Sequence, residues 1–157
     1  MKKLCAVGAA VALVLCVSGV RAADVSGAGF GPRGPNDAPY IRKGSFSGNG
    51  VTNDDTAIGH EVIAAFGGIE VNSSATHVWK VYGYNNGQAQ QCQVWGRDPA
   101  TGTAVAVGNS TSVSGNFNYT ISVTFNGTGI YLVSVLCNIP KVVSGAGSYL
   151  IGVMQIS

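Results

Sequence analysis

The sequence predicts an all-β protein: an antiparallel β-sandwich of the jelly-roll or immunoglobulin-like type, with one disulfide and at most one short helix. Three observations lead to this prediction. Glycine supplies 23 of the 157 residues, which is about twice its usual share and favours turns. Only 10% of the residues are charged, far fewer than helical bundles or charged disordered tails contain. Apolar stretches of strand length also recur about every 8–12 residues, a spacing typical of a sandwich.

The N-terminal segment, residues 1–23, has the three parts of a secretory signal peptide. Lys2 and Lys3 give a basic start, residues 4–20 are an apolar run, and small residues follow before Asp24. A membrane-spanning helix needs about 20 apolar residues, whereas a signal peptide uses a shorter run. We therefore expect cleavage after residue 23, a mature chain without a membrane span, and a secreted or periplasmic location in a bacterium.

Removal of this segment changes the charge of the chain. The full sequence has nine Lys and Arg against seven Asp and Glu, a net charge of +2. Lys2, Lys3 and Arg21 are removed with the signal peptide. Six basic and seven acidic residues remain, so the net charge becomes −1. The remaining Lys and Arg do not cluster, and electrostatic binding of nucleic acid depends on such a cluster. We expect no nucleic-acid partner.

The cysteines divide in the same way. Cys5 and Cys16 lie in the signal peptide, which leaves Cys92 and Cys137 in the mature chain. Two cysteines in an exported protein allow one internal pairing, and an oxidising compartment favours it. The bond would close a loop of about 45 residues, which stabilises a fold by roughly 4 kcal/mol in the chain-entropy model. Two free thiols or a metal site are the alternatives.

Two N-terminal stretches lack a clear strand pattern. Residues 24–39 hold three of the five prolines and several glycines, a composition typical of a flexible leader. The single sandwich domain is expected to occupy residues 40–157.

Within it, residues 55–66 form the one candidate helix, because Asp55 or Thr56 could cap its first turn.

The predicted strands rest on side-chain alternation and on turns. Residues 117–125 alternate strictly between apolar and polar side chains, as a half-buried strand does. Residues 130–139 are apolar on both faces and end at Pro140, which is typical of a central strand. The Asn-Asn-Gly and Asn-Gly turns at 85–87 and 126–127 are predicted to close hairpins. The predicted strands are residues 76–84, 88–96, 103–107, 117–125, 130–139 and 148–156.

Three aromatic residues, Trp95, Tyr84 and Tyr82, are candidate ligand-binding residues on the first predicted hairpin. If Cys92 faces the core, Trp95 faces outward, where its neighbours are glutamines. An aromatic ring framed by amides suits a sugar, because the flat ring packs on the apolar face of a pyranose and the amides bond its hydroxyls. The alternative is that Trp95 and the other tryptophan, Trp79, are packing residues of the core.

The acidic cluster at residues 53–55 suggests a metal site. Asp54 and Asp55 follow Asn53, and carboxylate and amide oxygens are the ligands that calcium prefers. Calcium is therefore the one cofactor that the sequence suggests, with Asp54 and Asp55 as its ligands. The alternative is a solvated turn that caps the following segment.

Catalytic residues are not predicted. His60 and His77 are the only histidines, and neither lies in a motif that supplies a nucleophile with its base. Glu61 and Glu70 could form a glycosidase pair only if the fold brought them together across a bond. We therefore expect a protein that is not an enzyme.

The function that these observations favour is an exported, non-catalytic module whose weakly charged surface is rich in Asn, Ser, Thr and Gln. Such a surface suits an extracellular or periplasmic structural or binding part, with a glycan or protein partner at the cell surface. Low charge also gives little repulsion between copies, so an oligomer is compatible with the sequence. The alternatives are a carbohydrate-binding module that uses exposed aromatics, and a small secreted hydrolase or inhibitor without a recognisable motif.

Overall fold

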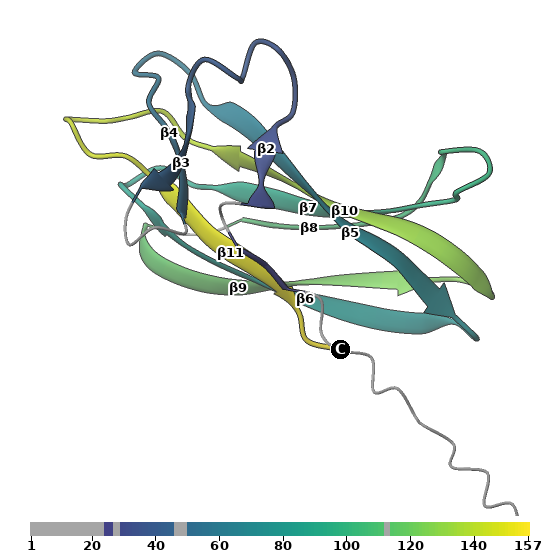
Figure 1. The fold of residues 1–157 in the computed structure, drawn as a ribbon. Helices are drawn as coiled ribbons and strands as arrows, with labels where there is room; N and C mark the ends of the chain where they lie inside the picture. Colours follow the sequence, from purple (N-terminus) through teal and green to yellow (C-terminus); the bar gives the residue numbers. More distant parts are fainter. Residues whose placement is uncertain (1–23, 27–28, 46–49, 112–113) are drawn as a thin grey trace, which may run out of the picture.

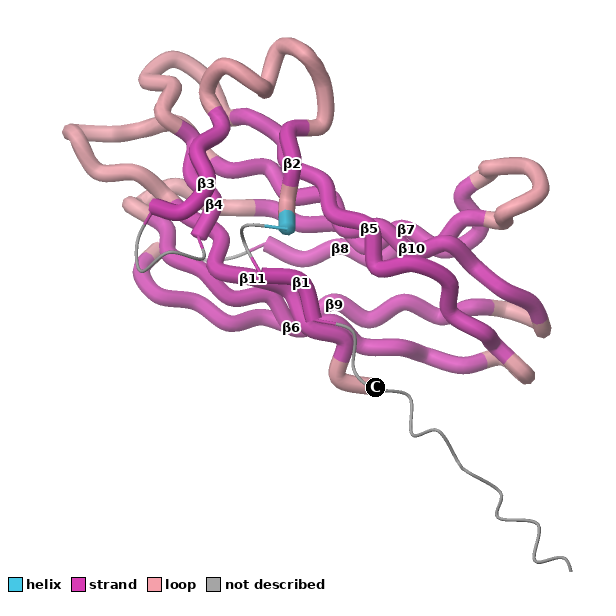
Figure 2. The backbone as a smooth tube through the Cα atoms, viewed as in Figure 1, coloured by secondary structure: helices cyan, strands magenta, loops and turns pink. Residues whose placement is uncertain are grey.

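The computed structural model describes residues 24–26, 29–45, 50–111 and 114–157, so the expected signal peptide lies outside the described residues. These residues form two antiparallel β-sheets that pack face to face (Figure 1). The described part of the chain contains no α-helix; a single 3₁₀ residue, Gly29, accounts for the short cyan stretch in Figure 2. None of the described residues forms a helix that could span a membrane. The predicted all-β sandwich is confirmed.

The two sheets share the strands almost equally. Sheet A has the order β3-β4-β11-β6-β9, with β1 also paired to β11. Its strands are β1 (Asp24–Ser26), β3 (Ile41–Ser45), β4 (Gly50–Asn53), β6 (Ala75–Asn85), β9 (Gly115–Phe125) and β11 (Tyr149–Gln155). Sheet B has the order β2-β5-β10-β7-β8. Its strands are β2 (Gly31–Pro32), β5 (His60–Val71), β7 (Gln91–Arg97), β8 (Ala104–Thr111) and β10 (Gly129–Ile139).

Both hairpins predicted from the Asn-Gly turns are wrong. β6 pairs with β9 and β11 in sheet A, whereas the next strand, β7, pairs with β8 and β10 in sheet B. β9 and β10 are likewise in different sheets. Trp79 on β6 and Val94 on β7 are both fully buried, because the apolar faces of these strands meet across the core. Alternation fixes the buried face of a strand and leaves open which sheet it joins.

The candidate helix at residues 55–66 does not form, which agrees with the prediction of at most one short helix. The Asp55 carboxylate does accept a hydrogen bond from the backbone N–H of Ala57, as a helix cap would, but here it closes a local turn. Strand β5 then begins at His60. Val62 is buried and Ile63 is exposed, the period-two pattern of a strand with one face on the core.

The segment expected to be a flexible leader, residues 24–39, takes part in both sheets. β1 pairs with residues 152–154 of β11, and Pro32 in β2 pairs with Val62 of β5. Between these strands the side chain of Phe30 is completely buried in the core. The turns at residues 33–40, which include Gly34, Pro35 and Pro39, then carry the chain from β2 in sheet B to β3 in sheet A.

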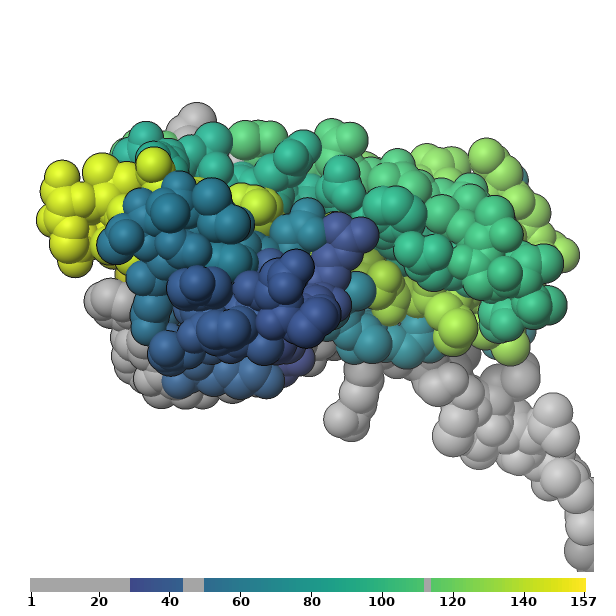
Figure 3. All heavy atoms as spheres, turned by 90° about the horizontal axis from the view of Figure 1, so that it is seen from above, coloured from purple at the N-terminus to yellow at the C-terminus, as the bar shows by residue number. Residues whose placement is uncertain are grey.

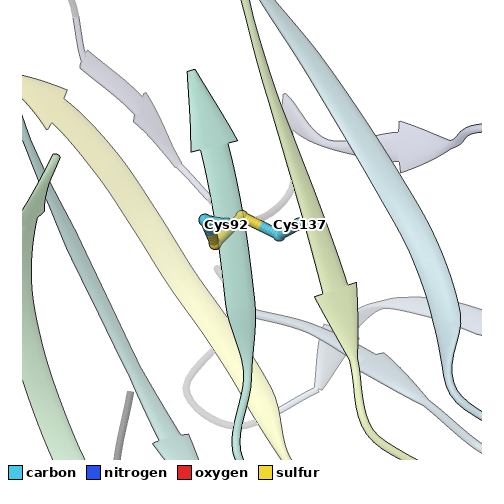
Figure 4. The surroundings of a disulfide bond; sticks show 2 residues. All are labelled: Cys92 and Cys137. Carbon is cyan, nitrogen blue, oxygen red and sulfur yellow. A yellow bond between two sulfur atoms is a disulfide. The ribbon is translucent and has the colours of Figure 1, made fainter. Parts of the chain in front are cut away.

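The predicted disulfide between Cys92 and Cys137 is present (Figure 4). The two cysteines lie directly opposite one another on β7 and β10, and both are fully buried. Since Cys92 points into the core, side chains of opposite parity on β7 point outward. The core around the disulfide is apolar and includes Trp79 and Phe125, whose rings meet edge to face with centroids 6.5 Å apart.

One edge of the sandwich is closed by contact between β8 and β9, the last strands of the two sheets. At Gly108 on β8, a Cβ atom would overlap the carbonyl oxygen of Ser122 and approach the side chain of Val123 to 2.8 Å. The backbone of β9 cannot move away, because β6 holds it along its whole length. Only glycine allows the two sheets to approach this closely.

We expect Gly108→Ala to lower the free energy of unfolding by about 2 kcal/mol, the usual cost of forcing an extra carbon into a packed contact. Urea unfolding followed by tryptophan fluorescence measures this change. Gly31→Ala is the matched control, because no atom lies within 4 Å of the position that an added Cβ would take there. Equal effects of the two substitutions would contradict a special role for Gly108.

Candidate functional site

The outer face of sheet B carries a shallow groove across β5, β10 and β7. It consists of two adjoining hollows of about 50 Å³ each, and Leu136 belongs to both. The polar hollow is lined by Glu61, Gln91, Gln93, Leu136 and Asn138. The arginine hollow is lined by Arg33, Ile63, Trp95, Arg97, Ser134 and Leu136.

Strand register explains why these side chains gather on one face. On β7, Gln91, Gln93 and Trp95 alternate with the buried Cys92 and Val94. Each outward residue faces an outward partner on β10: Asn138 opposite Gln91, Leu136 opposite Gln93 and Ser134 opposite Trp95. Directly opposed residues of neighbouring strands lie within side-chain reach, so the register builds rows of groove residues across the sheet.

Trp95 is held in place by contacts on its edge and on its face. Its indole N–H donates a hydrogen bond to the side-chain oxygen of Gln93 at 3.1 Å. The guanidinium of Arg97 lies over the ring, 4.8 Å from the centroid, at a cation–π distance. Arg97 also donates a hydrogen bond to the carbonyl of Gly102 at 2.9 Å. Trp95 is half-buried, so part of the fixed ring remains available to a ligand.

The two hollows differ in chemistry. Glutamine and asparagine amides give the polar hollow both donors and acceptors. The arginine hollow combines an apolar floor, from Ile63 and Leu136, with two guanidinium groups. The side chains of Arg33 and Glu61 form an ion pair that connects the two hollows. The groove can therefore hold a ligand that has both apolar faces and many hydrogen-bonding groups.

The structure does not bring Tyr82 and Tyr84 together with Trp95. Both tyrosines lie on the outer face of sheet A, since β6 belongs to that sheet. Tyr84 stacks on Tyr149 of β11, with ring centroids 5.4 Å apart and planes inclined by 20°. Lys80 lies 5.5 Å from the centroid of Tyr82. The aromatic platform expected from a β6–β7 hairpin is therefore two separate surfaces on opposite faces of the sandwich.

The two candidate calcium ligands face cations of the chain. The carboxylate of Asp54 forms an ion pair with Arg42, 3.0 Å apart. The carboxylate of Asp55 lies 2.9 Å from Nε2 of His60. Within residues 24–26, 29–45, 50–111 and 114–157, no group of three or more His, Cys, Asp or Glu side chains could hold a metal ion.

His60 is buried between two carboxylates at one end of the sandwich. Its Nδ1 lies 3.0 Å from Asp37 and its Nε2 lies 2.9 Å from Asp55, while Tyr40 stacks on the ring at 4.5 Å. Burial lowers the pKa of His60, but the hydrogen bonds with Asp55 and Asp37 and their charges outweigh burial, so its pKa is raised. A doubly protonated ring can donate to both carboxylates at once.

The two carboxylates are affected in the opposite direction. Burial works to raise the pKa of Asp37, yet hydrogen bonds from His60 and from the backbone N–H groups of Glu61 and Gly34 leave it lowered. The pKa of Asp55 is lowered first by the backbone N–H of Ala57 and then by His60. The three side chains therefore form an ionic cluster that joins two loops to the start of β5.

Beside this cluster lies a cleft of about 330 Å³. It is lined by Arg42, Thr52, Asn53, Asp54, Val142, Gly145 and Gly147. In Figure 3 the purple-to-blue N-terminal segment and the yellow segment that precedes β11 lie at this same end of the molecule. Asn53 connects the two, because its side-chain amide donates to the carbonyls of Ile139 and Pro140.

Glu61 and Glu70 do not form an acid–base pair with each other. Glu61 and Glu70 stand near opposite ends of β5, so roughly 25–30 Å of extended strand separates them. Carboxylates that act together on a glycosidic bond lie about 5–10 Å apart. Both ring nitrogens of His60 face the carboxylates of Asp37 and Asp55.

Sequence reasoning did not single out Arg33, Asp37 or Arg97. Arg97 has the same parity as Trp95 on β7, so extending the alternation by one step would have placed it on the same face. Arg33 and Asp37 fall in the stretch expected to be a flexible leader, and no local pattern there indicates their contacts with Glu61 and His60.

No protein family model matches the sequence, and no curated protein matches it. Among solved structures, the C-terminal CBM6 of LamC, a marine laminarinase from Zobellia galactanivorans, is similar with a TM-score of 0.52 at 12% identity. The match covers 87% of this chain and 100% of that one. A carbohydrate-binding module from Cellvibrio mixtus lichenase 5A, solved with cellotriose, has a TM-score of 0.48 at 12% identity and covers 86% of this chain and 96% of that one. The likeness to the first structure shows a shared β-sandwich fold.

The His60 cluster predicts a stability plateau between about pH 4 and 6.5. His60 has a raised pKa, so its contribution is complete below its ordinary value of 6.5 and is lost as the pH rises through the folded value. Asp37 and Asp55 have lowered pKa values, so their contribution is complete above 3.8 and is lost as the pH falls through the folded values. Urea unfolding at pH 3, 5.5 and 8.5 measures the loss of stability on the acid side and on the alkaline side of this plateau.

His60→Gln should remove the part of the alkaline decline that belongs to this ring. At pH 5.5 we expect the variant to lose about 2 kcal/mol, since two charge-assisted hydrogen bonds to a buried ring disappear. At pH 8.5 the difference from the unmodified protein should shrink. His77→Gln serves as the control, because within the described residues no Asp or Glu side chain lies within 4.0 Å of its ring nitrogens; Nδ1 contacts an oxygen of Ser157 and the amide of Gln155 instead. If the loss of unfolding free energy in His60→Gln stays constant from pH 5.5 to 8.5, the alkaline decline does not come from His60.

Proposed function

We propose that this protein is a non-catalytic module that binds carbohydrate in the groove on the outer face of sheet B. The observation that carries the proposal is the placement of Trp95, a fixed and half-buried indole beside the amide of Gln93 in a hollowed, outward-facing site. Aromatic packing supplies affinity for the apolar face of a sugar ring, and the flanking polar groups supply orientation.

The groove is suited to a sugar in its polarity as well. Gln91, Gln93 and Asn138 offer amide donors and acceptors in the polar hollow, which can bond sugar hydroxyls whatever their orientation. The neighbouring Ile63 and Leu136 offer an apolar floor. The β-sandwich that this protein shares with the CBM6 of the marine laminarinase is compatible with this function. An exported location, expected from the N-terminal segment, would bring the groove into contact with extracellular polysaccharide.

A second candidate function is contact with a protein at the cell surface. It is favoured by an apolar strip beside the groove, where Val105, Val107, Ile130 and Leu132 are each about half exposed, at 49%, 50%, 59% and 48%. All four lie on strands of sheet B. Exposed apolar clusters of this kind are typical of interaction surfaces. Binding of a glycan through Trp95 would leave the strip as an accessory contact.

We expect Trp95→Ala to weaken glycan binding by about 30-fold, corresponding to the roughly 2 kcal/mol that a central aromatic contributes to an interface. Affinity electrophoresis through gels that contain laminarin, xylan or polygalacturonate measures the change. The matched control is Tyr84→Ala, which removes an aromatic from the opposite face and should leave the mobility shift unchanged.

Two results would contradict this assignment. If Tyr84→Ala loses polysaccharide binding and Trp95→Ala keeps it, the binding site lies on sheet A. Failure of the unmodified protein to bind any polysaccharide, neutral or acidic, would remove the carbohydrate-binding function and favour the protein-contact candidate.

A further inference from the structure

We propose that the arginine hollow selects sugars that carry an anionic group, a carboxylate or a sulfate, and that the guanidinium of Arg97 binds this group. The inference rests on the proposed function and names the ligand class of the same groove. It follows from the ionic partners of the arginines, from the charge of the hollow and from the way in which Arg97 is held.

Arg97 differs from the other arginines of the described chain. Arg33 forms an ion pair with Glu61, and Arg42 forms one with Asp54. Among residues 24–26, 29–45, 50–111 and 114–157, no Asp or Glu carboxylate lies within 4.0 Å of Arg97. Its guanidinium donates to the carbonyl of Gly102 and lies over the ring of Trp95. The protein therefore leaves the charge of this one guanidinium without an ionic partner, beside the ring expected to hold the sugar.

The contacts of Arg97 also fix its orientation. The indole of Trp95 supports the guanidinium and the carbonyl of Gly102 accepts from Nη1, which accounts for one of its five N–H donors. A guanidinium presents its remaining donors as a planar fork that matches the two oxygens of a carboxylate or sulfate. Because the side chain is already held in place, less rotamer entropy is lost when an anion binds.

The local charge of the hollow is opposite in sign to that expected for the mature chain. The arginine hollow is lined by two guanidiniums, Arg33 and Arg97, and by no carboxylate; Glu61, which pairs with Arg33, lines the polar hollow. Arg33 follows β2 and Arg97 ends β7, so the two cations approach the hollow from opposite sides of β5 and β10. An anionic group between them would meet positive charge from both sides.

The apolar floor of the hollow favours binding of a sugar over binding of a simple anion. Ile63, Leu136 and Trp95 give this hollow an apolar surface next to the guanidiniums. A small inorganic anion gains nothing from such a floor, whereas a pyranose packs an apolar face on it. Pairing of charges beside apolar surface is also less screened by water and salt than pairing in the open. The ligand that fits is a sugar with one charged substituent.

The test uses pairs of polymers in which one member has its anionic group masked or removed. Polygalacturonate is compared with its methyl ester for the carboxylate, and carrageenan is compared with its desulfated form for the sulfate. Isothermal titration calorimetry on the unmodified protein should show at least tenfold tighter binding to the charged member of one pair. That pair then identifies the anionic group. The preference should decrease when NaCl is raised from 50 to 500 mM.

Arg97→Gln should reduce the ratio of charged to uncharged affinity by about tenfold, the loss of a charge-assisted pair of hydrogen bonds. Arg97→Lys, which keeps the charge and loses the fork, should give an intermediate ratio. Lys43→Gln is the charge-matched control, because Lys43 is exposed on β3 of the other sheet, and its ratio should equal that of the unmodified protein. Urea unfolding confirms that each variant is folded.

Glu61→Gln is expected to change the affinity in the opposite direction. It removes the carboxylate that pairs with Arg33, so the hollow becomes more positive and the charged polymer should bind about threefold more tightly. Misfolding cannot produce such a gain. Weaker binding of the charged polymer by this variant, relative to the uncharged one, would contradict the proposal.

The outcomes separate this inference from the function on which it rests. Trp95-dependent binding of uncharged polymers, with no preference for either charged one, would overturn the anionic selection and keep the carbohydrate-binding function. A charge preference that survives in Arg97→Gln would overturn the role of Arg97. Absence of binding to all four polymers, with Trp95-dependent binding of laminarin or xylan retained, would overturn the inference alone. Absence of binding to these and to every other polysaccharide tested would overturn the proposed function as well.

Discussion

The direct pairing of Cys92 with Cys137 is the constraint on which the two faces of sheet B depend. The bond locks β7 to β10 in one register, with both sulfur atoms in the core. Because side chains alternate with a period of two, a slip by one residue would turn Trp95 into the core and Val94 into solvent. The covalent link that stabilises the interior thus also determines which residues form the groove outside.

Short-range patterns in the sequence were enough to predict features that depend only on a strand's own alternation. Residues 117–125 form a strand as predicted, and the inward direction of Cys92 places Trp95 on an outer face beside Gln93. The choice of sheet could not be predicted in this way. A turn at residues 85–87 can fold a strand back on its neighbour or carry it across the core, and the buried faces look alike in both cases.

Long-range contacts explain the other differences. Phe30 and Asp37 lie in a stretch whose proline and glycine content suggests flexibility, yet Phe30 enters the core and Asp37 bonds to His60. Asp55 has the local chemistry of a helix cap, and its carboxylate does accept from Ala57, but the β-branched residues that follow pair with β10. In each case a partner distant in sequence outweighs the local propensity.

The close approach of β8 and β9 at Gly108 has a consequence for association between molecules. An unpaired strand edge is a template for another chain, and a protein with few charges has little electrostatic repulsion to prevent such pairing. Here the terminal strands of the two sheets cover one another. At the other ends of the strand order, β2 has only two residues and includes Pro32, while β3 presents exposed Arg42 and Lys43. Protection against edge-to-edge aggregation therefore comes from backbone geometry and a few well-placed residues, in a chain that has little net charge to provide it.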